Sequence, residues 1–453
     1  MAKLSAPSGF RDFPPDAFRK RQELIQRVRE VYESFGFEGI ETPVMEDLSV
    51  FAGKAGENEK LMFTIMRRGE ALTKQLEVYK NAPPEKQAEA QKQLADAGMR
   101  FDLTVPLARF YATHRANLPA IFKRYHIGPV WRADRAQRGR FREFFQCDVD
   151  VIGSASMMVE AEVILATSTA LARLGFTGLT VKLNARPLLQ LLGASYGVAA
   201  DQINRFFIEI DKLEKITPEE AQANLAAIGM PPDQSAKMLA FYAASRNADS
   251  YALLGQAEAQ VGAAAAEHVK QLREICELTP ALPSGKLMFD PFLARGMDYY
   301  TGPIFEIAAE GVPFALGGGG RYDNLLAAFS GQKVPACGFS IGFERVLTLM
   351  EERNMFGANT RAADVLIAVP SPESQRAALE LGLELRAAGL RVDVYPGAAK
   401  LPKQFELAEK KGLGWAALPQ PDGQVTLREL ATRQDTSLNR AEAAAWLKAK
   451  LGL

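Results

Sequence analysis

Residues 100–153 most constrain the fold, because their polarity alternates and they are rich in aromatic and β-branched side chains. A period of two predicts strands, with one short helix at 105–115. Successive side chains of a strand point to opposite faces, so parity sorts residues 140–151 into two sets. One face carries Arg140, Arg142, Phe144, Gln146, Asp148 and Asp150. The other face is mostly apolar and is predicted to meet the core, with Phe141, Glu143, Phe145, Cys147, Val149 and Val151.

The strand predicted just before this one is sorted in the same way. Its polar face carries Arg132 and Asp134, and its other face carries Tyr125, Ile127 and Trp131. A solvated sheet face is the ordinary explanation of such a pattern. Two arginines, a ring, an amide and an acid in a row instead favour a ligand with phosphates, a flat base and an ammonium group. Arginine presents a planar charged fork to phosphate, phenylalanine offers a face to a base, and glutamine and aspartate accept hydrogen bonds from an amine.

Helical periodicity at 14–36 and composition further along predict most of the other elements in the first two thirds of the chain. A helix is predicted over residues 14–36, from a proline pair and a capping aspartate to a terminal glycine. Residues 74–97 are rich in Lys, Gln, Glu and Ala and predict an exposed helical hairpin that turns at Pro83-Pro84, an insertion in solvent. A long helix follows residue 155. After the strand "LTVKLN" at 179–184, a helical insertion is predicted at about 186–275.

Strands return in the last third of the chain. They are predicted at 286–310, followed by the glycine run "GGGGRYD" at 317–323 and a helix at 341–353. The segment "FGANTRAA" at 356–363 is expected to be a linker. From residue 364 onward strands and helices alternate as βαβαβ, which predicts a separate domain with a parallel sheet.

Composition limits the partners and the compartment. Lys and Arg together number 54, as do Asp and Glu, so a nucleic-acid partner would have to be held by local basic patches. Three distant cysteines, Cys147, Cys276 and Cys337, form no C-x-x-C pair and indicate a reducing compartment. No secretory leader and no long apolar run occur, so we expect a cytoplasmic protein without a membrane span.

Two further features do not indicate cofactor chemistry by themselves. The three histidines, His114, His126 and His268, have no metal-ligand spacing, so structural roles are expected for them. The run "GGGGRYD" lacks the G-x-G-x-x-G spacing of dinucleotide sites, and no G-K-[ST] follows it. Taken alone, it would be a flexible turn.

Several motifs together resemble a known family. The segment "YHIGPVWRADRAQRGRFREFFQCDVDVIG" at 125–153 resembles motif 2 of the class II aminoacyl-tRNA synthetases, in its histidyl-tRNA synthetase form. "IETPVMEDLSVF" at 40–51 resembles motif 1, and "GFSIGFERVLTLM" at 338–350 resembles motif 3. "ARGMDYYTG" at 294–302 and "GGGGRYD" are characteristic of the histidine enzymes, and the resemblance implies that the glycine run is a strand end packed beside the histidine pocket. The resemblance runs from about residue 7 to the C-terminus.

The resemblance implies a fold and an activity. The fold is α/β, with an α+β catalytic domain at 1–360 whose class II antiparallel sheet is flanked by helices, and an anticodon-binding domain at 364–453. The activity is histidine–tRNA ligation. ATP activates L-histidine to an adenylate with release of pyrophosphate, and the histidyl group then passes to the 3′ end of tRNA-His. ATP is a substrate, Mg²⁺ is expected on the phosphates, and a homodimer is expected through motif 1 around Pro43.

The resemblance also implies roles for single residues. Three arginines are the implied catalytic groups: Arg132 and Arg295 at the α-phosphate, and Arg345 at the γ-phosphate. Arg140 would clamp the phosphates and Phe144 would stack on adenine. In the histidine pocket, Asp102, Thr104 and Gln146 would receive the α-ammonium group, and Asp150 and Tyr300 would hold the imidazole. The implied lining of this pocket has seven residues: Asp102, Leu103, Thr104, Gln146, Asp150, Tyr299 and Tyr300.

The chain departs from the family pattern in two places. The insertion at 74–97 precedes "RFDLTVP", where the family usually has a short hairpin, and Asn324 follows "GGRYD", where glycine is common. Neither departure removes an implied catalytic group.

Two other functions share this fold. A non-catalytic, synthetase-like regulatory subunit of ATP phosphoribosyltransferase would bind histidine without charging tRNA, but such proteins usually lack the anticodon-binding domain and lose motif arginines. A class II synthetase for another amino acid is disfavoured by "ARGMDYYTG" together with Asp150. For tRNA, a basic run in the C-terminal domain is the expected grip, although charge runs of this kind are often only solvated surface: Arg391, Lys400, Lys403, Lys410, Lys411 and Arg428.

Overall fold

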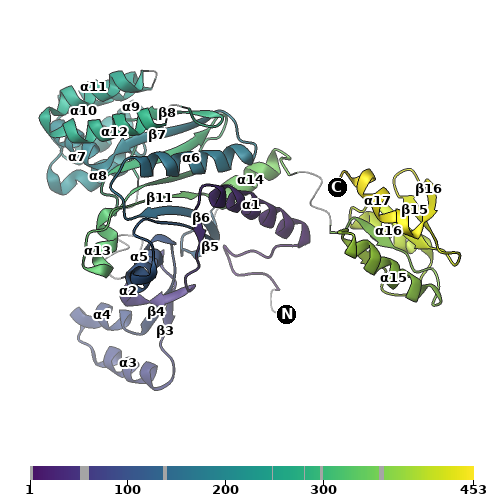
Figure 1. The fold of residues 1–453 in the computed structure, drawn as a ribbon. Coiled ribbons are helices and arrows are strands. Elements are labelled where there is room, and N and C mark those ends of the chain that lie inside the picture. Colours follow the sequence, from purple (N-terminus) through teal and green to yellow (C-terminus); the bar gives the residue numbers. More distant parts are fainter. Residues whose placement is uncertain are drawn as a thin grey trace. The chain divides into compact units, whose positions relative to one another are not determined.

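The computed structural model describes residues 4–51, 61–135, 140–246, 248–279, 281–295, 299–356 and 362–453. The chain divides into two compact units, coloured along the sequence in Figure 1. The first unit falls within residues 1–12 and 23–355, and the second within residues 13–22 and 356–453. Most of the linker predicted at 356–363 lies outside the described residues.

A mixed sheet is the centre of the first unit. Among the described residues it has eight strands, in the order β1-β5-β6-β11-β10-β9-β7-β8. The outer pairs β1–β5 and β7–β8 are parallel, and every pair between them is antiparallel. The strands are β1 (Glu38–Gly39), β5 (Phe122–Trp131), β6 (Glu143–Ile152), β7 (Leu179–Ala185), β8 (Gly285–Phe289), β9 (Pro303–Ala309), β10 (Gly317–Arg321) and β11 (Ala336–Ile341).

The two longest strands of this sheet are formed by the segment whose polarity alternates. β5 and β6 pair without a register shift, from Phe122 opposite Ile152 to Trp131 opposite Glu143. Helix α5 (Thr104–His114) precedes them, so the predicted strands and the predicted short helix are confirmed. The mixed α/β class is confirmed as well.

Helices cover the sheet, as Figure 1 shows. Helix α6 packs on β6 and β11, α14 packs on β6, and α5 packs against α13. The predicted N-terminal helix is α1, which ends just before Gly36, a glycine in the left-handed region with φ 77°. These helices are α1 (Pro15–Ser34), α2 (Leu48–Phe51), α6 (Met158–Arg173), α13 (Asp323–Ser330) and α14 (Phe343–Glu352).

The segment between β7 and β8 is helical, and it covers the range of about 186–275 in which helices were expected. It has its own core, in which Phe206, Leu225 and Met238 are fully buried. Its helices are α7 (Arg186–Ser195), η4 (Ala200–Gln202), α8 (Ile203–Ile210), α9 (Pro218–Ala227), α10 (Pro232–Ser245), α11 (Ser250–Val261), η5 (Ala263–Ala265) and α12 (Ala266–Leu278).

A small sheet carries the predicted helical hairpin. Its strands β2 (Met45–Asp47), β4 (Ala95–Met99) and β3 (Thr64–Met66) lie in the order β2-β4-β3. Between β3 and β4 the chain forms α3 (Gly69–Asn81), η2 (Pro84–Lys86) and α4 (Gln87–Lys92). The exposed hairpin and its turn at the proline pair are confirmed. Its predicted end at residue 97 is wrong, because residues 95–97 pair in the sheet with β2 and β3.

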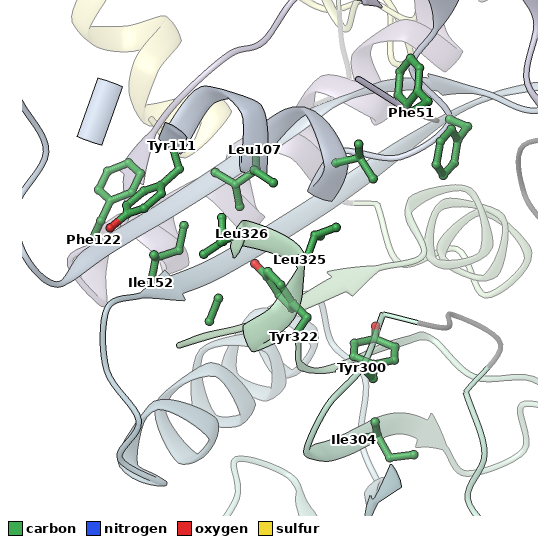
Figure 2. Close-up of a cluster of buried hydrophobic side chains, with 14 of the residues drawn as sticks. Phe51, Leu107, Tyr111, Phe122, Ile152, Tyr300, Ile304, Tyr322, Leu325 and Leu326 are labelled. Carbon is green, nitrogen blue, oxygen red and sulfur yellow. The ribbon is translucent and has the colours of Figure 1, made fainter. Parts of the chain in front are cut away.

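A cluster of buried side chains joins α5 and α13 to the ends of β5 and β6 (Figure 2). It includes Leu107 of α5, Leu326 of α13 and Ile152 of β6. Figure 2 also shows Tyr300 and Tyr322 among these aliphatic side chains. The cluster therefore holds two phenols in place by packing.

The second unit contains a five-stranded sheet in the order β13-β12-β14-β15-β16. The first three strands are parallel, which confirms the predicted βαβαβ pattern, but β15 and β16 add an antiparallel pair that the pattern did not include. Among the described residues of the whole chain, no helix combines the length and the apolar character that crossing a membrane requires. The elements are β12 (Val365–Ile367), α15 (Ser374–Ala387), β13 (Val392–Val394), α16 (Leu401–Lys410), β14 (Trp415–Pro419), β15 (Gln424–Glu429), β16 (Asp435–Asn439) and α17 (Arg440–Leu451).

Candidate active site

A cavity of about 1090 Å³ opens in the first unit above the middle of the large sheet. Its walls come from β6, β10 and β11, from the start of α5 and from α14. Clefts that combine apolar walls with a few converging polar groups are the usual form of ligand sites. The cavity has an acidic end, which we define as Asp102, Asp148 and Asp150, and a basic end, which we define as Arg140, Arg295 and Arg345.

Asp102 lies just before helix α5. Its Oδ1 accepts a hydrogen bond from the Val105 N–H at 3.2 Å, while its Oδ2 is buried and has no hydrogen-bond partner within the described residues. Burial raises the pKa of Asp102 to about 6, although the Val105 N–H, Arg132 and Arg124 oppose the shift. A buried carboxylate oxygen without a partner is costly, so this atom is a natural acceptor for a ligand.

Asp150 is held by two neighbouring side chains. It lies opposite Arg124 in the β5–β6 register, and the Arg124 Nη2 is 2.6 Å from the Asp150 Oδ2. The Tyr322 hydroxyl donates to Oδ1. Burial raises the pKa of Asp150, and Arg124 opposes the rise. Gly338 of β11 is also opposite Asp150, and a Cβ at that position would overlap the carboxylate.

Asp148 lies on the same face of β6, two residues before Asp150. Burial raises its pKa to about 7, and the neighbouring Asp150 adds to the rise while Arg124 opposes it. Its carboxylate meets the hydroxyl of Ser340 and the amide of Gln146, whose Nε2 is 3.4 Å from Oδ1. The Gln146 Oε1 is buried and has no hydrogen-bond partner within the described residues.

Two tyrosines lie against the acidic end. The rings of Tyr299 and Tyr300 are 5.0 Å apart, and that of Tyr299 is 5.9 Å from Tyr322. The Tyr299 hydroxyl also hydrogen-bonds with Thr104. Burial raises the pKa of both Tyr299 and Tyr300, so they are neutral phenols at neutral pH.

The basic end is built from side chains with fewer contacts. The Arg295 Nη1 pairs with Glu306 of β9 at 2.9 Å, and a Cβ at Gly318 of β10 would overlap its guanidinium. The Arg140 Nη2 pairs with Asp134 at 2.9 Å while half of the Arg140 side chain, 54%, stays exposed.

Arg345 lies in the first turn of α14 and donates to the Ala315 carbonyl at 3.1 Å. Partial removal from water lowers the pKa of Arg345, although much of the side chain remains exposed, and repulsion from Arg295 and Arg140 lowers it further. Three guanidinium groups that repel one another across a cavity form a site for a polyanion.

Arg132 and Phe144 lie on the cavity wall as well. The Arg132 guanidinium is 5.1 Å from the centre of the Phe144 ring, and its Nε donates to the Phe101 carbonyl at 2.9 Å. The backbone bond orients the arginine, and the ring supports its face.

The cavity brings together all but one of the residues expected in the site. Its lining includes Asp102, Thr104, Arg132, Arg140, Phe144, Gln146, Asp150, Arg295, Tyr299, Tyr300 and Arg345. Leu103 does not line it. Its side chain is fully buried, and its carbonyl accepts from Arg124 at 3.5 Å.

The parity count is wrong at the start of the segment. β6 begins at Glu143, so residues 140–142 do not follow its alternation. Arg142 donates to the Asp134 carbonyl outside the cavity, while Phe141, expected on the core face, lines the cavity beneath Arg11. The glycine run is strand β10 rather than a flexible turn.

Sequence reasoning did not assign roles to four residues of the site. Asp148 could have been found from its i, i+2 relation to Asp150, which puts both on one face. Arg124, Tyr322 and Ser340 reach the acidic end from neighbouring segments, and no local pattern indicates this. Among the described residues, no three His, Cys, Asp or Glu side chains gather in a way that could hold a metal ion.

Comparisons with known proteins agree with this geometry. The family model described as histidyl-tRNA synthetase matches residues 89–346, and one described as an anticodon binding domain matches residues 364–450. The histidine–tRNA ligase of Leifsonia xyli is 40% identical over 90% of this chain and 94% of its own length. That of Gloeobacter violaceus is 35% identical over the whole of both chains.

The crystal structure of histidyl-tRNA synthetase from Nostoc sp. PCC 7120 superposes with a TM-score of 0.82 at 26% identity, covering 99% of this chain and all of the other. A Bacillus halodurans structure titled as an ATP phosphoribosyltransferase regulatory subunit/histidyl-tRNA synthetase has a TM-score of 0.71 at 19% identity over 90% of this chain and 96% of that one, which shows the shared fold alone.

Proposed function

The chain belongs to the histidyl-tRNA synthetase family, and from that premise we propose how its cavity activates histidine. The activity is that of a histidine–tRNA ligase, an enzyme that uses ATP to join histidine to tRNA. One observation carries the proposal: a single cavity holds three buried carboxylates at one end and three guanidinium groups at the other. This arrangement suits an amino acid whose carboxylate must meet the phosphates of ATP.

The acidic end binds the amino acid. The Asp102 Oδ2 and the neighbouring Gln146 Oε1 are buried and have no hydrogen-bond partner among the described residues, and they receive the α-ammonium group, with Thr104 beside them. A carboxylate offers about four lone-pair positions, and those of Asp150 are only partly occupied by Arg124 and Tyr322. Asp150 therefore accepts an imidazole N–H, and the Tyr300 hydroxyl meets the other ring nitrogen.

The basic end binds the nucleotide. Arg132 and Arg295 hold the α-phosphate, Arg345 the γ-phosphate, and Arg140 clamps the chain of phosphates, while Phe144 stacks on adenine. The histidine carboxylate attacks the α-phosphorus, and pyrophosphate leaves. Such a displacement needs little covalent help from the protein, so the rate comes from positioning and from fixed positive charge.

Family membership implies Mg²⁺, and the cavity fits an ion that arrives on the nucleotide. Mg²⁺ is usually held by one or two carboxylates together with phosphate oxygens and water. Beside Arg345 the lining contains the carboxylates Glu344 and Glu352, of which Glu344 also pairs with Arg11. When bound, the ion offsets charge on the phosphates.

We assign residues 1–360 to catalysis and 364–453 to tRNA binding. Four of the six basic residues expected to grip tRNA are paired within the unit: Arg391 with Asp364, Lys410 with Glu406, Lys411 with Asp393 and Arg428 with Asp435. Lys400 and Lys403 are exposed and form no ion pair in the part of the chain that the structure describes. They are therefore the best candidates for phosphate contacts.

Charge reversal at Lys400 and Lys403 tests this assignment. The double variant Lys400→Glu/Lys403→Glu should raise the KM for tRNA and flatten its salt dependence, because two phosphate contacts are lost. Pyrophosphate exchange should not change. Arg376→Glu, which alters an exposed arginine of the same unit, is the control. An unchanged tRNA KM would rule out these lysines.

The homodimer remains a proposal. The segment that resembles motif 1 leaves Pro43, Val44 and Met45 exposed, with Val44 at 48% and Met45 at 49%. An apolar surface of this kind suits an isologous contact. Sedimentation at assay concentrations tests it, and a fully active monomer would contradict it. We also place the enzyme in the cytoplasm, in keeping with its three free thiols.

One assay tests the proposed reaction. ATP–pyrophosphate exchange is measured with each of the amino acids in turn, and histidine alone should support it. A regulatory subunit without catalysis would exchange with none, and a synthetase for another amino acid would exchange with that one.

A further inference from the structure

Asp148 has no part in the reaction as proposed, although it is 3% exposed and lines the cavity. It occupies the middle of the sheet, opposite His126 of β5 and opposite Ser340 of β11. Charged and titratable groups face it from each element packed around it: Asp150 on its own strand, Arg124 and His126 on β5, Tyr32 on α1, Arg100 and Asp102 before α5, and Tyr299 and Tyr300.

The direction of the hydrogen bonds around Asp148 follows from its neighbours. Asp148 hydrogen-bonds with Ser340, and an ionised carboxylate can only accept, so the Ser340 hydroxyl donates to it. Because the Ser340 hydroxyl proton is used in the bond to Asp148, the Ser340 Oγ accepts from the Gln146 Nε2 at 3.1 Å. The same Nε2 is 3.4 Å from the Asp148 Oδ1.

These two acceptors determine which way the Gln146 amide faces. If the amide were turned over, the Gln146 Oε1 would face the Asp148 carboxylate and the Ser340 Oγ. Three acceptors would then meet without a proton between them. The observed orientation instead leaves the Gln146 Oε1 buried and without a partner in the described structure. That oxygen is then available to a ligand that donates hydrogen bonds.

We propose that Asp148 and Ser340 are positioning residues of the histidine subsite, which hold the Gln146 amide with its oxygen toward the substrate ammonium group. The inference rests on the proposed function, since it concerns how the same site binds its amino acid. Asp148 does not touch the substrate and acts through Gln146. Protonation removes the charge of Asp148 and gives it an O–H donor, which weakens its hold on the Gln146 amide, so the KM for histidine should rise as the pH falls through about 7.

Two substitutions test the proposal by pyrophosphate exchange. Asp148→Asn and Ser340→Ala should each raise the KM for histidine on the order of 10-fold, because an ammonium group loses an oriented acceptor. The kcat and the KM for ATP should stay within about 2-fold, because the basic end is unaltered. Ser235→Ala is the matched control, since Ser235 is fully buried and donates only within α10. Its histidine KM should equal that of the wild type.

The pH dependence separates positioning from general damage. The ratio of the Asp148→Asn KM to the wild-type KM should be about 10 above pH 7 and should fall toward about 1 below it. Titration of histidine itself cancels in this ratio. A ratio that does not change with pH would overturn the role assigned to the ionised carboxylate.

A double-variant cycle asks whether Asp148 acts through Gln146. In a Gln146→Ala background, Asp148→Asn should change the histidine KM by less than about 2-fold. A full effect in that background would overturn the proposal, because Asp148 would then act directly or through the fold. If Asp148→Asn does not fold, Ser340→Ala in the same two backgrounds decides the question. Absence of histidine-dependent exchange in the wild type would instead refute the proposed function.

Discussion

The two ends of the cavity hold opposite charges by different means. Asp148 and Asp150 of the acidic end lie on β6, between β5 and β11, and Asp102 lies just before α5. The side chains of Asp150 and of its partner Arg124 are 4% and 0% exposed. Asp148 and Asp150 are fixed by side chains from neighbouring segments, and Asp102 is fixed by a backbone N–H of α5. The arginines of the basic end come from the segments before β6 and before β9 and from the first turn of α14. They are more exposed, and in the described structure each is held by one acceptor.

This difference in burial determines which charges can change at each end. Burial can return a proton to a carboxylate, so the groups at the acidic end can change charge near neutral pH, as the raised pKa values of Asp102 and Asp148 indicate. A guanidinium group keeps its proton under all ordinary conditions, so the basic end supplies constant charge. The acidic end should therefore control selection and pH dependence, and the basic end should control rate.

The largest expected effect is on amino-acid selection, which we assign to the acidic end alone. Phenylalanine, which fills similar space without ring nitrogens, would leave Asp150 desolvated and without a ring donor. Its kcat/KM in pyrophosphate exchange should be lower than that of histidine by roughly 10⁴-fold or more. A histidine analogue that keeps a ring N–H should remain a substrate. A kcat/KM for phenylalanine within about 100-fold of that for histidine would contradict this role of the acidic end.

Removing the cation of the acidic end should destabilise the fold. Arg124→Met leaves buried carboxylates without their ion-pair partner, which should lower the free energy of unfolding by about 3–5 kcal/mol at a pH well above 7. Chemical denaturation at fixed protein concentration measures it. Arg109→Met, which breaks the more exposed pair with Glu46, should cost about 1 kcal/mol or less.

The same variant should be less damaged at lower pH. Burial raises the pKa of Asp148 from 3.8 to about 7, so its ionisation costs stability that is absent below pH 3.8, grows between these values and is complete above 7. Without Arg124 the pKa values of Asp148 and Asp150 rise further. The loss in Arg124→Met should therefore shrink as the pH falls toward about 5. A loss that does not change with pH would show that these acids do not titrate.

Removing a cation of the basic end should slow the reaction and spare binding. Arg295→Ala should reduce pyrophosphate exchange on the order of 10²-fold or more, because a fixed charge at the α-phosphate is lost. Histidine binding, measured by equilibrium dialysis, should be largely intact. Arg376→Ala, at an exposed arginine of the second unit, is the control. Near-normal exchange by Arg295→Ala would contradict its assignment.

Replacing Gly338 or Gly318 by alanine adds one methyl group at either end of the cavity and so tests the two ends separately. A Cβ at Gly338 overlaps Asp150, which Arg124 and Tyr322 hold in place, whereas a Cβ at Gly318 overlaps the far end of a flexible arginine, Arg295. Gly338→Ala should cost about 1–3 kcal/mol of stability and raise the histidine KM.

Gly318→Ala should mainly lower kcat, because the arginine can move aside at little cost in folding. Thermal denaturation and exchange kinetics on the pair measure both effects. Equal increases of the histidine KM in the two variants would mean that the ends are not separate.

Much of the architecture could be predicted from the sequence. Alternating polarity predicted β5 and β6, and apolar residues spaced by three and four predicted α1. A composition rich in Ala, Gln and Leu predicted the helical segment after β7. One error lies at an element end, because the alternation was continued before Glu143, where the strand has not begun. Another is the antiparallel pair β15–β16, which was not predicted. Where a strand begins depends on its partners, which a local pattern does not contain.

The sequence by itself determined which residue types reach the cavity, because a strand's parity decides the face of each side chain and the motifs mark the arginines. Only the tertiary structure decided how the charges pair. Arg124 meets Asp150, Ser340 meets Asp148, and most of the basic run in the second unit is neutralised by its own acids. The physical reason is that pairing depends on the register between separate strands, and the charge of a carboxylate depends on how much water the folded chain removes from it.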